Sequence, residues 1–388
     1  MKNKTKLSSF NRVISYSLVI ATLFILTFQL SAQDKGTQSY FQLTSQDIVM
    51  RPYLQAVTHN SITVMVESKN ETPIFAYYGE DTDFGKSSVT KFTKPTGADP
   101  QTYVHRIVLD SLEPNKNYNY KVIEKGKEYR GSFKTAVLPG TPFKFAAMGD
   151  TRTYVNKHGA VAKGIESHSP HFSLYSGDLC AHPTYESWKS EFFIREELSL
   201  ITNVPFLNAV GNHEDWSTAT EAFTEAPPSN SGEQFYYSFD YGDVHFLVIS
   251  TEHGLSSNAA QVKFAKKDLK NSKAKWKIAM FHIPAYCGGG HGENKVMKNF
   301  TTEVLEPNNV DVVLTGHSHF YQSNYVNGIY HIVSAGGGAP LYTPKKMSYT
   351  QTQAKVHHYM IWEASADKLA FKVYDIKGNL IDKMELKK

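Results

Sequence analysis

The sequence predicts a two-domain chain of mixed α+β and α/β character, in which an N-terminal β-sandwich precedes a layered α/β domain. Three observations carry this prediction. Short alternating strand patterns separated by turn-rich pieces fill Ile48–Thr135, without helical periodicity. From Phe143 onward, apolar strand-like runs alternate with helical stretches. Between the two parts lies Val137–Pro142 (VLPGTP), a Pro/Gly-rich stretch that suits a domain boundary.

The first 32 residues have the composition of a targeting signal. Four basic residues accompany the mostly apolar run Val13–Leu30, and Leu30-Ser31-Ala32 offers small residues for cleavage before Gln33. We therefore predict a signal peptide over residues 1–32, a secreted or periplasmic location, and no stable membrane insertion after cleavage. Because an 18-residue apolar run is long enough to span a bilayer, a retained membrane anchor is the alternative.

Charge and cysteine content narrow the function classes. The formal net charge of +4 comes entirely from residues 1–32, so the remaining chain balances to zero. It therefore lacks the overall basic field that nucleic-acid binding requires, and we expect no nucleic-acid scaffold. The two cysteines, Cys180 and Cys287, would meet an oxidising compartment after export. A disulfide between them and two unpaired thiols are both open.

The domain plan follows from these patterns. Residues 33–45 are polar and are predicted to be a linker, 46–137 a seven-strand sandwich, and 138–388 the α/β domain. In the sandwich, Leu112-Glu113-Pro114 ahead of Tyr118 resembles the tyrosine-corner region of fibronectin type III-like domains. In the second domain, helices are expected over Lys157–Ser167 and Asn258–Lys270, and Thr218–Asn230 is expected to be an exposed loop. Strands are predicted over Ser61–Glu67, Ile74–Tyr78, Tyr103–Leu109, Tyr118–Glu124, Glu128–Phe133, Gly328–Ser334, His358–Ala364 and Leu369–Asp375.

Five further apolar runs each end on residues of the kind that bind metal ions. Mixed Asp, Asn and His side chains at the ends of buried strands can meet at one rim of a sheet. Such a set, free of thiolates, suits hard to borderline divalent or trivalent metals, so the chain reads as a metalloenzyme. The runs are Phe143–Asp150 (FKFAAMGD), His171–Asp178 (HFSLYSGD), Pro205–Glu214 (PFLNAVGNHE), Trp276–His282 (WKIAMFH) and Val310–His319 (VDVVLTGHSH).

The order GD, GD, GNHE, H and GHSH resembles the calcineurin-like metallophosphoesterase superfamily. Within it, the chain is most similar to bacterial purple acid phosphatase-like proteins with an N-terminal fibronectin type III-like domain. Tyr237–Glu252 resembles the strand that follows the GNHE motif in that family, and His282-Ile283-Pro284 with His291 resembles its pair of metal and substrate histidines. The resemblance implies a layered α/β/β/α catalytic domain that holds two metal ions.

The resemblance also implies a role for each motif residue. One aspartate would bind the first metal ion together with the last histidine, the second aspartate would bridge both ions, and the other three residues would complete the second position. These metal ligands are Asp150, Asp178, Asn212, His282, His317 and His319. His213 and His291 would contact phosphate and protonate the leaving oxygen, a role that suits histidine near neutral pH. The alternatives are a loop-bracing role for His213 and a flexible Gly-rich surrounding for His291.

Two positions depart from the family pattern. Purple acid phosphatases place a tyrosine three residues after the second-motif aspartate, where this chain has Ala181. Other superfamily members place a histidine two residues after the first aspartate, where this chain has Arg152. The first metal ion would then lack one protein ligand, with water or His182 as candidates, and the protein should not be purple. The metal identity stays open among Fe, Zn and Mn. Arg152 would bind two oxygens of the phosphate, or form a salt bridge at the rim.

Together these features predict an exported metal-dependent phosphoesterase. It would hydrolyse small-molecule phosphomonoesters with a metal-activated hydroxide at a dinuclear site. Phosphodiesterase or nucleotide hydrolase activity on the same site is the alternative. A non-catalytic binding protein with a vestigial metal site is a third reading, which the nearly complete ligand set opposes.

Overall fold

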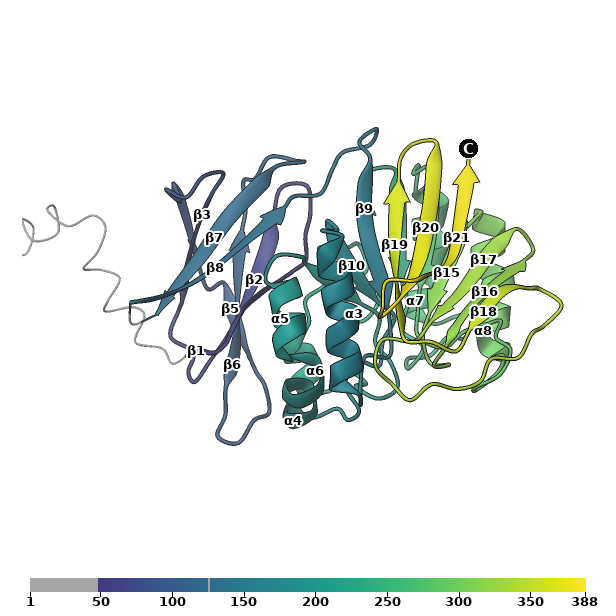
Figure 1. Cartoon of the computed structure of the whole chain (residues 1–388). Helices are drawn as coiled ribbons and strands as arrows, with labels where there is room; N and C mark the ends of the chain where they lie inside the picture. The colour runs from purple at the N-terminus through teal and green to yellow at the C-terminus, as the bar shows by residue number, and fades with distance from the viewer. Residues whose placement is uncertain (1–47, 125) are drawn as a thin grey trace, which may run out of the picture.

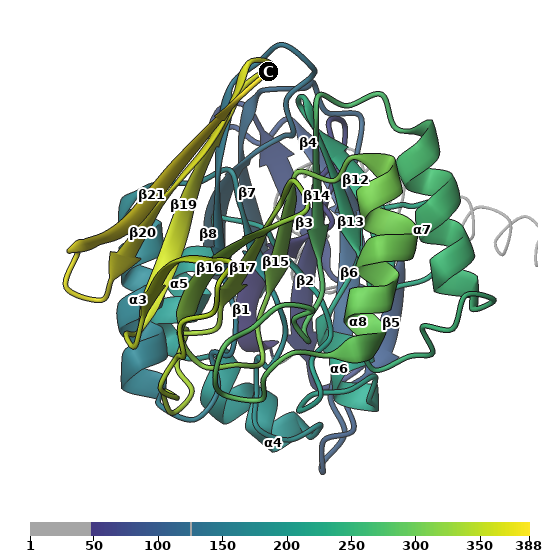
Figure 2. The ribbon, with the colours of Figure 1, turned by 90° about the vertical axis from the view of Figure 1, so that its right-hand side faces the viewer.

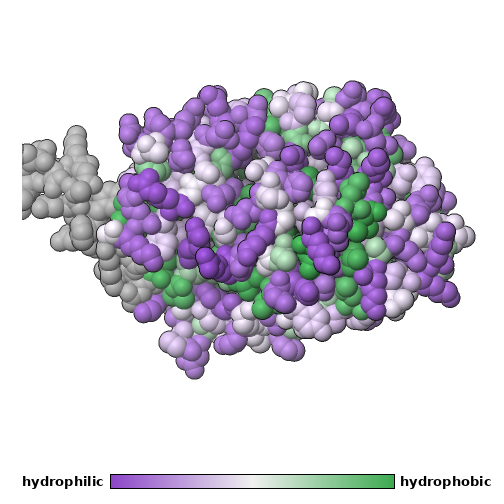
Figure 3. Space-filling model, viewed as in Figure 1, coloured by the Kyte–Doolittle hydropathy of each residue, from purple (hydrophilic) through white to green (hydrophobic). Residues whose placement is uncertain are grey.

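A computed structural model describes residues 48–124 and 126–388 as a β-sandwich beside a layered α/β domain (Figure 1). The predicted signal peptide over residues 1–32 and the linker over 33–45 lie outside the described residues. Within the described ranges, no helix is both long and apolar enough to cross a membrane. The face seen in Figure 1 is largely hydrophilic, as expected where apolar side chains fill interior cores (Figure 3).

The sandwich consists of two four-stranded antiparallel sheets rather than the predicted seven strands. β4 and β5 escape a sequence pattern because they are short and mostly exposed, so they lack alternating apolar residues. The Tyr118 hydroxyl accepts a hydrogen bond from the Glu113 amide at 3.0 Å, a contact of the kind that tyrosine corners make. One sheet has the order β1 (Ile48–Gln55), β2 (Ile62–Ser68), β6 (Tyr103–Leu109), β5 (Phe92–Pro95). The other has the order β4 (Lys86–Val89), β3 (Phe75–Gly79), β7 (Asn117–Glu124), β8 (Lys127–Lys134).

Two mixed sheets form the second part of the molecule. In each, a parallel core carries the apolar runs that the sequence predicts as strands. Antiparallel strands extend one edge of the six-stranded sheet and both edges of the seven-stranded sheet. The six-stranded sheet has the order β11 (Phe206–Asn208), β10 (Phe172–Tyr175), β9 (Phe143–Met148), β19 (His358–Ala364), β20 (Lys368–Asp375), β21 (Leu380–Lys387). The seven-stranded sheet has the order β12 (Tyr237–Tyr241), β13 (Val244–Val248), β14 (Trp276–Met280), β15 (Val312–Thr315), β17 (Ile329–Ser334), β16 (Tyr321–Val326), β18 (Thr350–Ala354).

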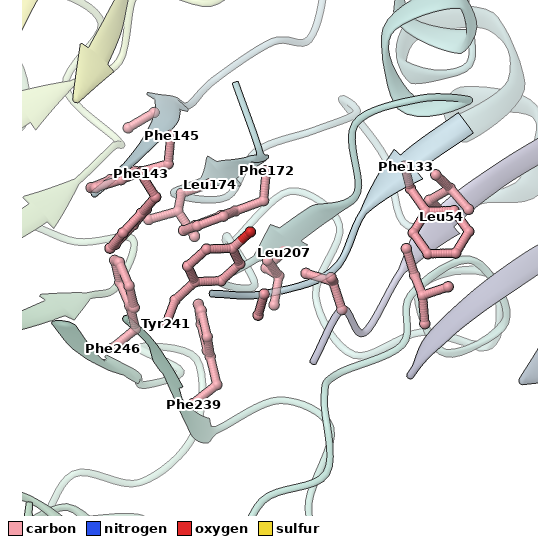
Figure 4. Close-up of a cluster of buried hydrophobic side chains, with 14 of the residues drawn as sticks. Leu54, Phe133, Phe143, Phe145, Phe172, Leu174, Leu207, Phe239, Tyr241 and Phe246 are labelled. Atoms are coloured by element: carbon pink, nitrogen blue, oxygen red, sulfur yellow. The ribbon is translucent and has the colours of Figure 1, made fainter. Parts of the chain in front are cut away.

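The sheets pack face to face, with helices outside, as an α/β/β/α arrangement. Aromatic rings fill the space between the sheets: Phe145 and Phe172 meet Phe246 edge to face, with ring centroids 5.3 and 5.6 Å apart (Figure 4). Helices α3 (Val155–Ser167) and α5 (Arg195–Ile201) cover one outer face, and α7 (Ala260–Asn271) and α8 (Lys295–Phe300) the other (Figure 2). The sequence therefore predicted both long helices, α3 and α7, within a few residues of their observed bounds.

The interface between the sandwich and the α/β domain corrects one prediction. Thr218–Asn230 is not simply an exposed loop, because Thr218–Phe223 forms helix α6, capped by the Ser217 hydroxyl, which accepts from the Thr220 amide. The C-terminal end of α6 packs on the sandwich, where the Tyr53 hydroxyl donates to the Phe223 carbonyl at 3.0 Å. Two turns of helix buried by another domain leave too little periodicity to be recognised in a sequence.

Both cysteines are buried and carry free thiols, so the disulfide alternative is wrong for this structure. Burial raises the pKa of Cys287 to about 11, which keeps that thiol protonated and unreactive at neutral pH. The cysteines therefore pack as small apolar residues, Cys180 beside the six-stranded sheet and Cys287 under the loop after β17.

Candidate metal centre

The predicted ligands meet where the parallel strands of both sheets end. Asp150 and Asp178 follow β9 and β10, while His282 and His319 follow β14 and β15. Carboxyl ends of parallel strands share one edge of a sheet, and two facing sheets place two such edges together. Ligand atoms of Asp150, Asp178 and His319 all lie within 4.8 Å of one another, close enough to hold one ion.

Left-handed backbone conformations aim three of these side chains into the site. Asp150 and Asp178 have φ of 57° and His317 has φ of 70°, a region that L residues seldom adopt. Each follows a glycine, which lets neighbouring ligand loops touch. A Cβ on Gly316 would lie 2.5 Å from Asp150 Oδ2, and one on Gly177 would lie 2.8 Å from a backbone nitrogen. Any side chain at these glycines would therefore separate the ligand loops.

Glu214 braces the loops that carry the ligands. Its fully buried carboxylate accepts hydrogen bonds from the amides of Asp178 at 3.0 Å, Leu179 at 3.2 Å and Gly211 at 3.0 Å. Burial and the neighbouring Asp178 carboxylate raise the pKa of Glu214 to about 8. One side chain thus ties the loop after β10 to the loop after β11, which fixes Asp178 relative to Asn212.

Three ligand groups that are neutral when they bind a metal ion meet at the second predicted metal position. Asn212 Oδ1 lies 3.1 Å from His282 Nε2 and 3.0 Å from His317 Nδ1, and the two ring nitrogens are 3.3 Å apart. His282 Nδ1 lies 2.8 Å from the Ser176 carbonyl, so Nδ1 keeps its proton when a metal ion takes the place of the proton on Nε2. Burial and the nearby histidines lower the pKa of His317 to about 3. Converging lone pairs of this kind suit a metal ion.

The first predicted position is built from Asp150 and His319. His319 Nε2 lies 3.4 Å from Asp150 Oδ1, and its Nδ1 donates to the Pro340 carbonyl at 2.8 Å. His319 resembles His282 in this respect: a backbone carbonyl fixes the tautomer of the ring, and the other ring nitrogen faces the site. Both oxygens of Asp150 also accept from the His317 amide at 3.0 Å, which joins the two positions.

The electrostatic field of the site favours positive charge. Burial alone would lower the pKa of His282, but the carboxylates of Asp178 and Asp150 raise it to about 10. A position where carboxylates hold a proton on a fully buried imidazole also stabilises a metal cation. The donor set, the fixed tautomers and the field together fit a pair of metal ions.

Comparisons with known proteins agree with this geometry. Residues 143–321 match the family model described as calcineurin-like phosphoesterase, and residues 50–135 match that of the purple acid phosphatase N-terminal domain. Residues 143–321 therefore form a calcineurin-like metallophosphoesterase domain. Such a domain implies a dinuclear metal centre, whose metals the fold does not specify.

The relatives found are plant proteins, which corrects the expected likeness to bacterial ones. Purple acid phosphatase 23 of Arabidopsis thaliana is 26% identical over 276 residues, covering 59% of this chain and 58% of its own length. Probable inactive purple acid phosphatase 1 of the same plant is 25% identical, covering 62% of this chain and 49% of its own. This chain therefore spans about half to three fifths of such relatives. A purple acid phosphatase from yellow lupin (Lupinus luteus) seeds shares the fold, with a TM-score of 0.73 at 21% identity, covering 87% of this chain and 74% of that one.

Within this metallophosphoesterase site, the three predicted substrate residues border the ligands. His213 donates its amide to Asp178 Oδ1 at 3.1 Å, while its ring, one third exposed, has Nδ1 2.8 Å from the Ala181 carbonyl. The exposed His291 ring stacks on His317 with centroids 4.2 Å apart. Arg152 reaches Asp178 Oδ2 from Nε at 3.4 Å. His182 is exposed on the loop after Asp178.

Two residues at this site belong to no recognised sequence motif, and the sequence analysis did not predict them. The Tyr342 ring stacks on His319 with centroids 4.3 Å apart and meets His291 edge to face at 5.4 Å. Glu191 accepts from the amides of Thr153 at 3.1 Å and Ala181 at 2.9 Å, so it links the loops after β9 and β10. Neither residue follows a strand or sits in a distinctive pattern, so only the three-dimensional contacts identify them.

Proposed function

We propose that this metallophosphoesterase hydrolyses small-molecule phosphomonoesters. The observation that supports the proposal is the meeting of two aspartates, one asparagine and three histidines at the ends of strands from both sheets. A metal pair, when bound, would supply the Lewis acidity that activates water and polarises a phosphate oxygen. The chain's own groups would hold the ions, orient the ester and move a proton.

The proposed ligand roles follow the contacts. Asp178 is central, with Oδ1 near His282 at 3.2 Å and Oδ2 near Arg152, so it suits the bridging position. Asp150 and His319 would hold the first ion. Asn212, His282 and His317 would hold the second, with His282 kept in its ligating tautomer by a backbone carbonyl.

Three residues are proposed to act on the ester. His213, one third exposed, and His291, exposed, lie beside the ligands, so they would bind the phosphate and protonate the leaving oxygen. Arg152 would bind two phosphate oxygens through its planar guanidinium. Arg152→Ala should then lower kcat/KM by about tenfold to a thousandfold, and an unchanged kcat/KM would remove Arg152 from this role.

Asp178→Ala is the main test of the proposal. Loss of the bridging carboxylate should abolish bound metal, measured by plasma mass spectrometry, together with turnover of p-nitrophenyl phosphate. Asp81→Ala, an exposed position in the sandwich, is the matched control and should change neither. Full activity in Asp178→Ala would eliminate the site. Reconstitution of metal-free protein with Fe, Zn or Mn, each assayed for turnover, identifies the working metal pair.

The alternative reaction, hydrolysis of phosphodiesters or nucleotides on the same site, is separated by substrate. Rates on p-nitrophenyl phosphate and bis-p-nitrophenyl phosphate should differ in favour of the monoester; the opposite ranking would favour the diesterase. One similar plant protein is named as probably inactive, which makes turnover by metal-loaded protein the measurement that separates an enzyme from a binding protein.

We also propose export of the chain. Cleavage between Ala32 and Gln33 would leave a polar linker, a fibronectin type III-like sandwich over residues 46–137 and a catalytic domain over 138–388. N-terminal sequencing of the protein recovered outside the cytoplasm tests both points. A chain that begins at Met1 in the membrane fraction would favour the retained anchor.

A further inference from the structure

The Arg152 side chain lies against the ligands of the first metal position. Its Nη2 is 3.3 Å from His319 Nε2 and its Nε is 3.4 Å from Asp178 Oδ2. These are two of the three residues whose ligand atoms gather within 4.8 Å. The Arg152 side chain is only 14% exposed, so water screens its charge little.

A guanidinium in this place opposes a metal ion in two ways. It donates toward the His319 nitrogen and the Asp178 oxygen that an ion at the first position would need. It also keeps a permanent positive charge within a few ångströms of that ion, because arginine does not lose its proton in proteins. Either effect weakens binding at the first position.

The second position lacks this competitor. Within the described part of the chain, the side-chain polar contacts of Asn212, His282 and His317 run to one another, to Asp178 and to a backbone carbonyl of a neighbouring loop. No lysine or arginine is among them. The ligands there are preorganised and touch no guanidinium or ammonium group, which favours tight binding.

We propose that the two metal positions load unequally: the second binds its ion tightly, and the first binds weakly because Arg152 occupies its ligands. Binding at the first position then requires the guanidinium to move off Asp178 and His319. The proposal rests on the metal ligands of the proposed function but not on the reaction itself. It also gives this chain a property set by a residue that departs from the family pattern.

The test is a metal titration of chelator-treated full-length protein with Mn²⁺, followed by calorimetry and by metal analysis after dialysis. The wild-type chain should bind one ion tightly and a second on the order of a hundredfold more weakly, as a like charge a few ångströms away predicts. At one equivalent, the electron paramagnetic resonance spectrum should show isolated Mn²⁺ without coupling to a second ion.

Two variants separate charge from shape. Arg152→Gln keeps most of the side-chain length and removes the charge, so it should tighten the weaker step by about tenfold to a thousandfold and leave the tight step unchanged. Arg152→Lys keeps the charge and should leave the weaker step weak. Circular dichroism confirms that each variant is folded, and Arg152→Ala replaces Arg152→Gln should the latter not fold.

Each outcome decides. Two ions of equal affinity in the wild-type chain, or an Arg152→Gln variant whose weaker step is unchanged, overturns the proposal. Absence of any metal binding overturns the ligand assignment as well. A chain that loads two ions unequally yet turns over no phosphate ester keeps this proposal and refutes the proposed function alone.

Discussion

Arg106 is one of the buried residues through which the sandwich holds the α/β domain, and its replacement gives the largest stability change we predict. It is fully buried on β6. Its Nε donates to Glu225 Oε2 at 2.8 Å. Its Nη2 donates to the carbonyls of Glu221 at 2.8 Å, Ala222 at 2.9 Å and Thr224 at 3.2 Å. The C-terminal end of helix α6 is therefore satisfied by a cation from another domain.

Arg106→Met should lower the free energy of unfolding by about 3–5 kcal/mol. Hydrogen bonds to a charged donor are worth roughly 1.5–3 kcal/mol each, but those from one guanidinium share a single desolvation cost and do not add. The main cost is that the Glu225 carboxylate, 14% exposed, and the α6 carbonyls lose their partner. Breaking a buried ion pair in this way costs about 3–5 kcal/mol.

Urea unfolding followed by tryptophan fluorescence and circular dichroism measures this loss. Arg130→Ala is the matched control, because Arg130 pairs with Glu128 at the surface and is 51% exposed, so its loss should cost less than about 1 kcal/mol. A double-mutant cycle with Glu225→Gln should give a coupling of at least about 1.5 kcal/mol. An Arg106→Met variant as stable as the Arg130→Ala control would refute the reasoning.

Two further predictions concern other parts of the molecule. Burial alone would lower the pKa of His245, but hydrogen bonds to Asp240 and Asp268 raise it to about 9. Its folded pKa then exceeds the unfolded one, so stability should fall as the pH rises from about 6.5 to 9. His245→Gln should flatten that part of the urea-midpoint profile, and an identical slope in the variant would contradict the assignment. Tyr342→Ala should weaken Mn²⁺ binding by about twofold to tenfold through loss of ring stacking on His319, whereas Tyr342→Phe should retain it; equal affinities in the two variants would exclude this positioning role.

The fold of this protein can be predicted from its sequence best where buried strands end on polar residues. The runs ending on Asp150, Asp178 and His282 are apolar because both faces of each strand are covered, and the ligands stand out because they break that pattern. The positions of the predicted ligands relative to one another follow from the topology of parallel strands. Local composition was therefore sufficient for the buried strands of the metallophosphoesterase domain and for the types of ligand at their ends.

Contacts between distant segments were beyond sequence reasoning. Helix α6 depends on Arg106, more than a hundred residues earlier, and no local pattern records that dependence. The tautomers of His282 and His319 are fixed by backbone carbonyls, which every residue has, so their identity holds no clue. The place of the Arg152 guanidinium among the first ligands likewise depends on the meeting of two sheets.

The left-handed backbone at the ligand loops has a consequence for laboratory evolution. Asparagine and glycine tolerate the φ of 57° at Asp150 and Asp178 better than most residues do, and neither brings a buried negative charge. Selection of the metal-free chain for heat resistance should therefore enrich such replacements. The selected variants should gain thermal stability and lose metal binding. The same selection in saturating metal should preserve both aspartates, because the bound ion then stabilises the folded chain and offsets the backbone strain at these residues.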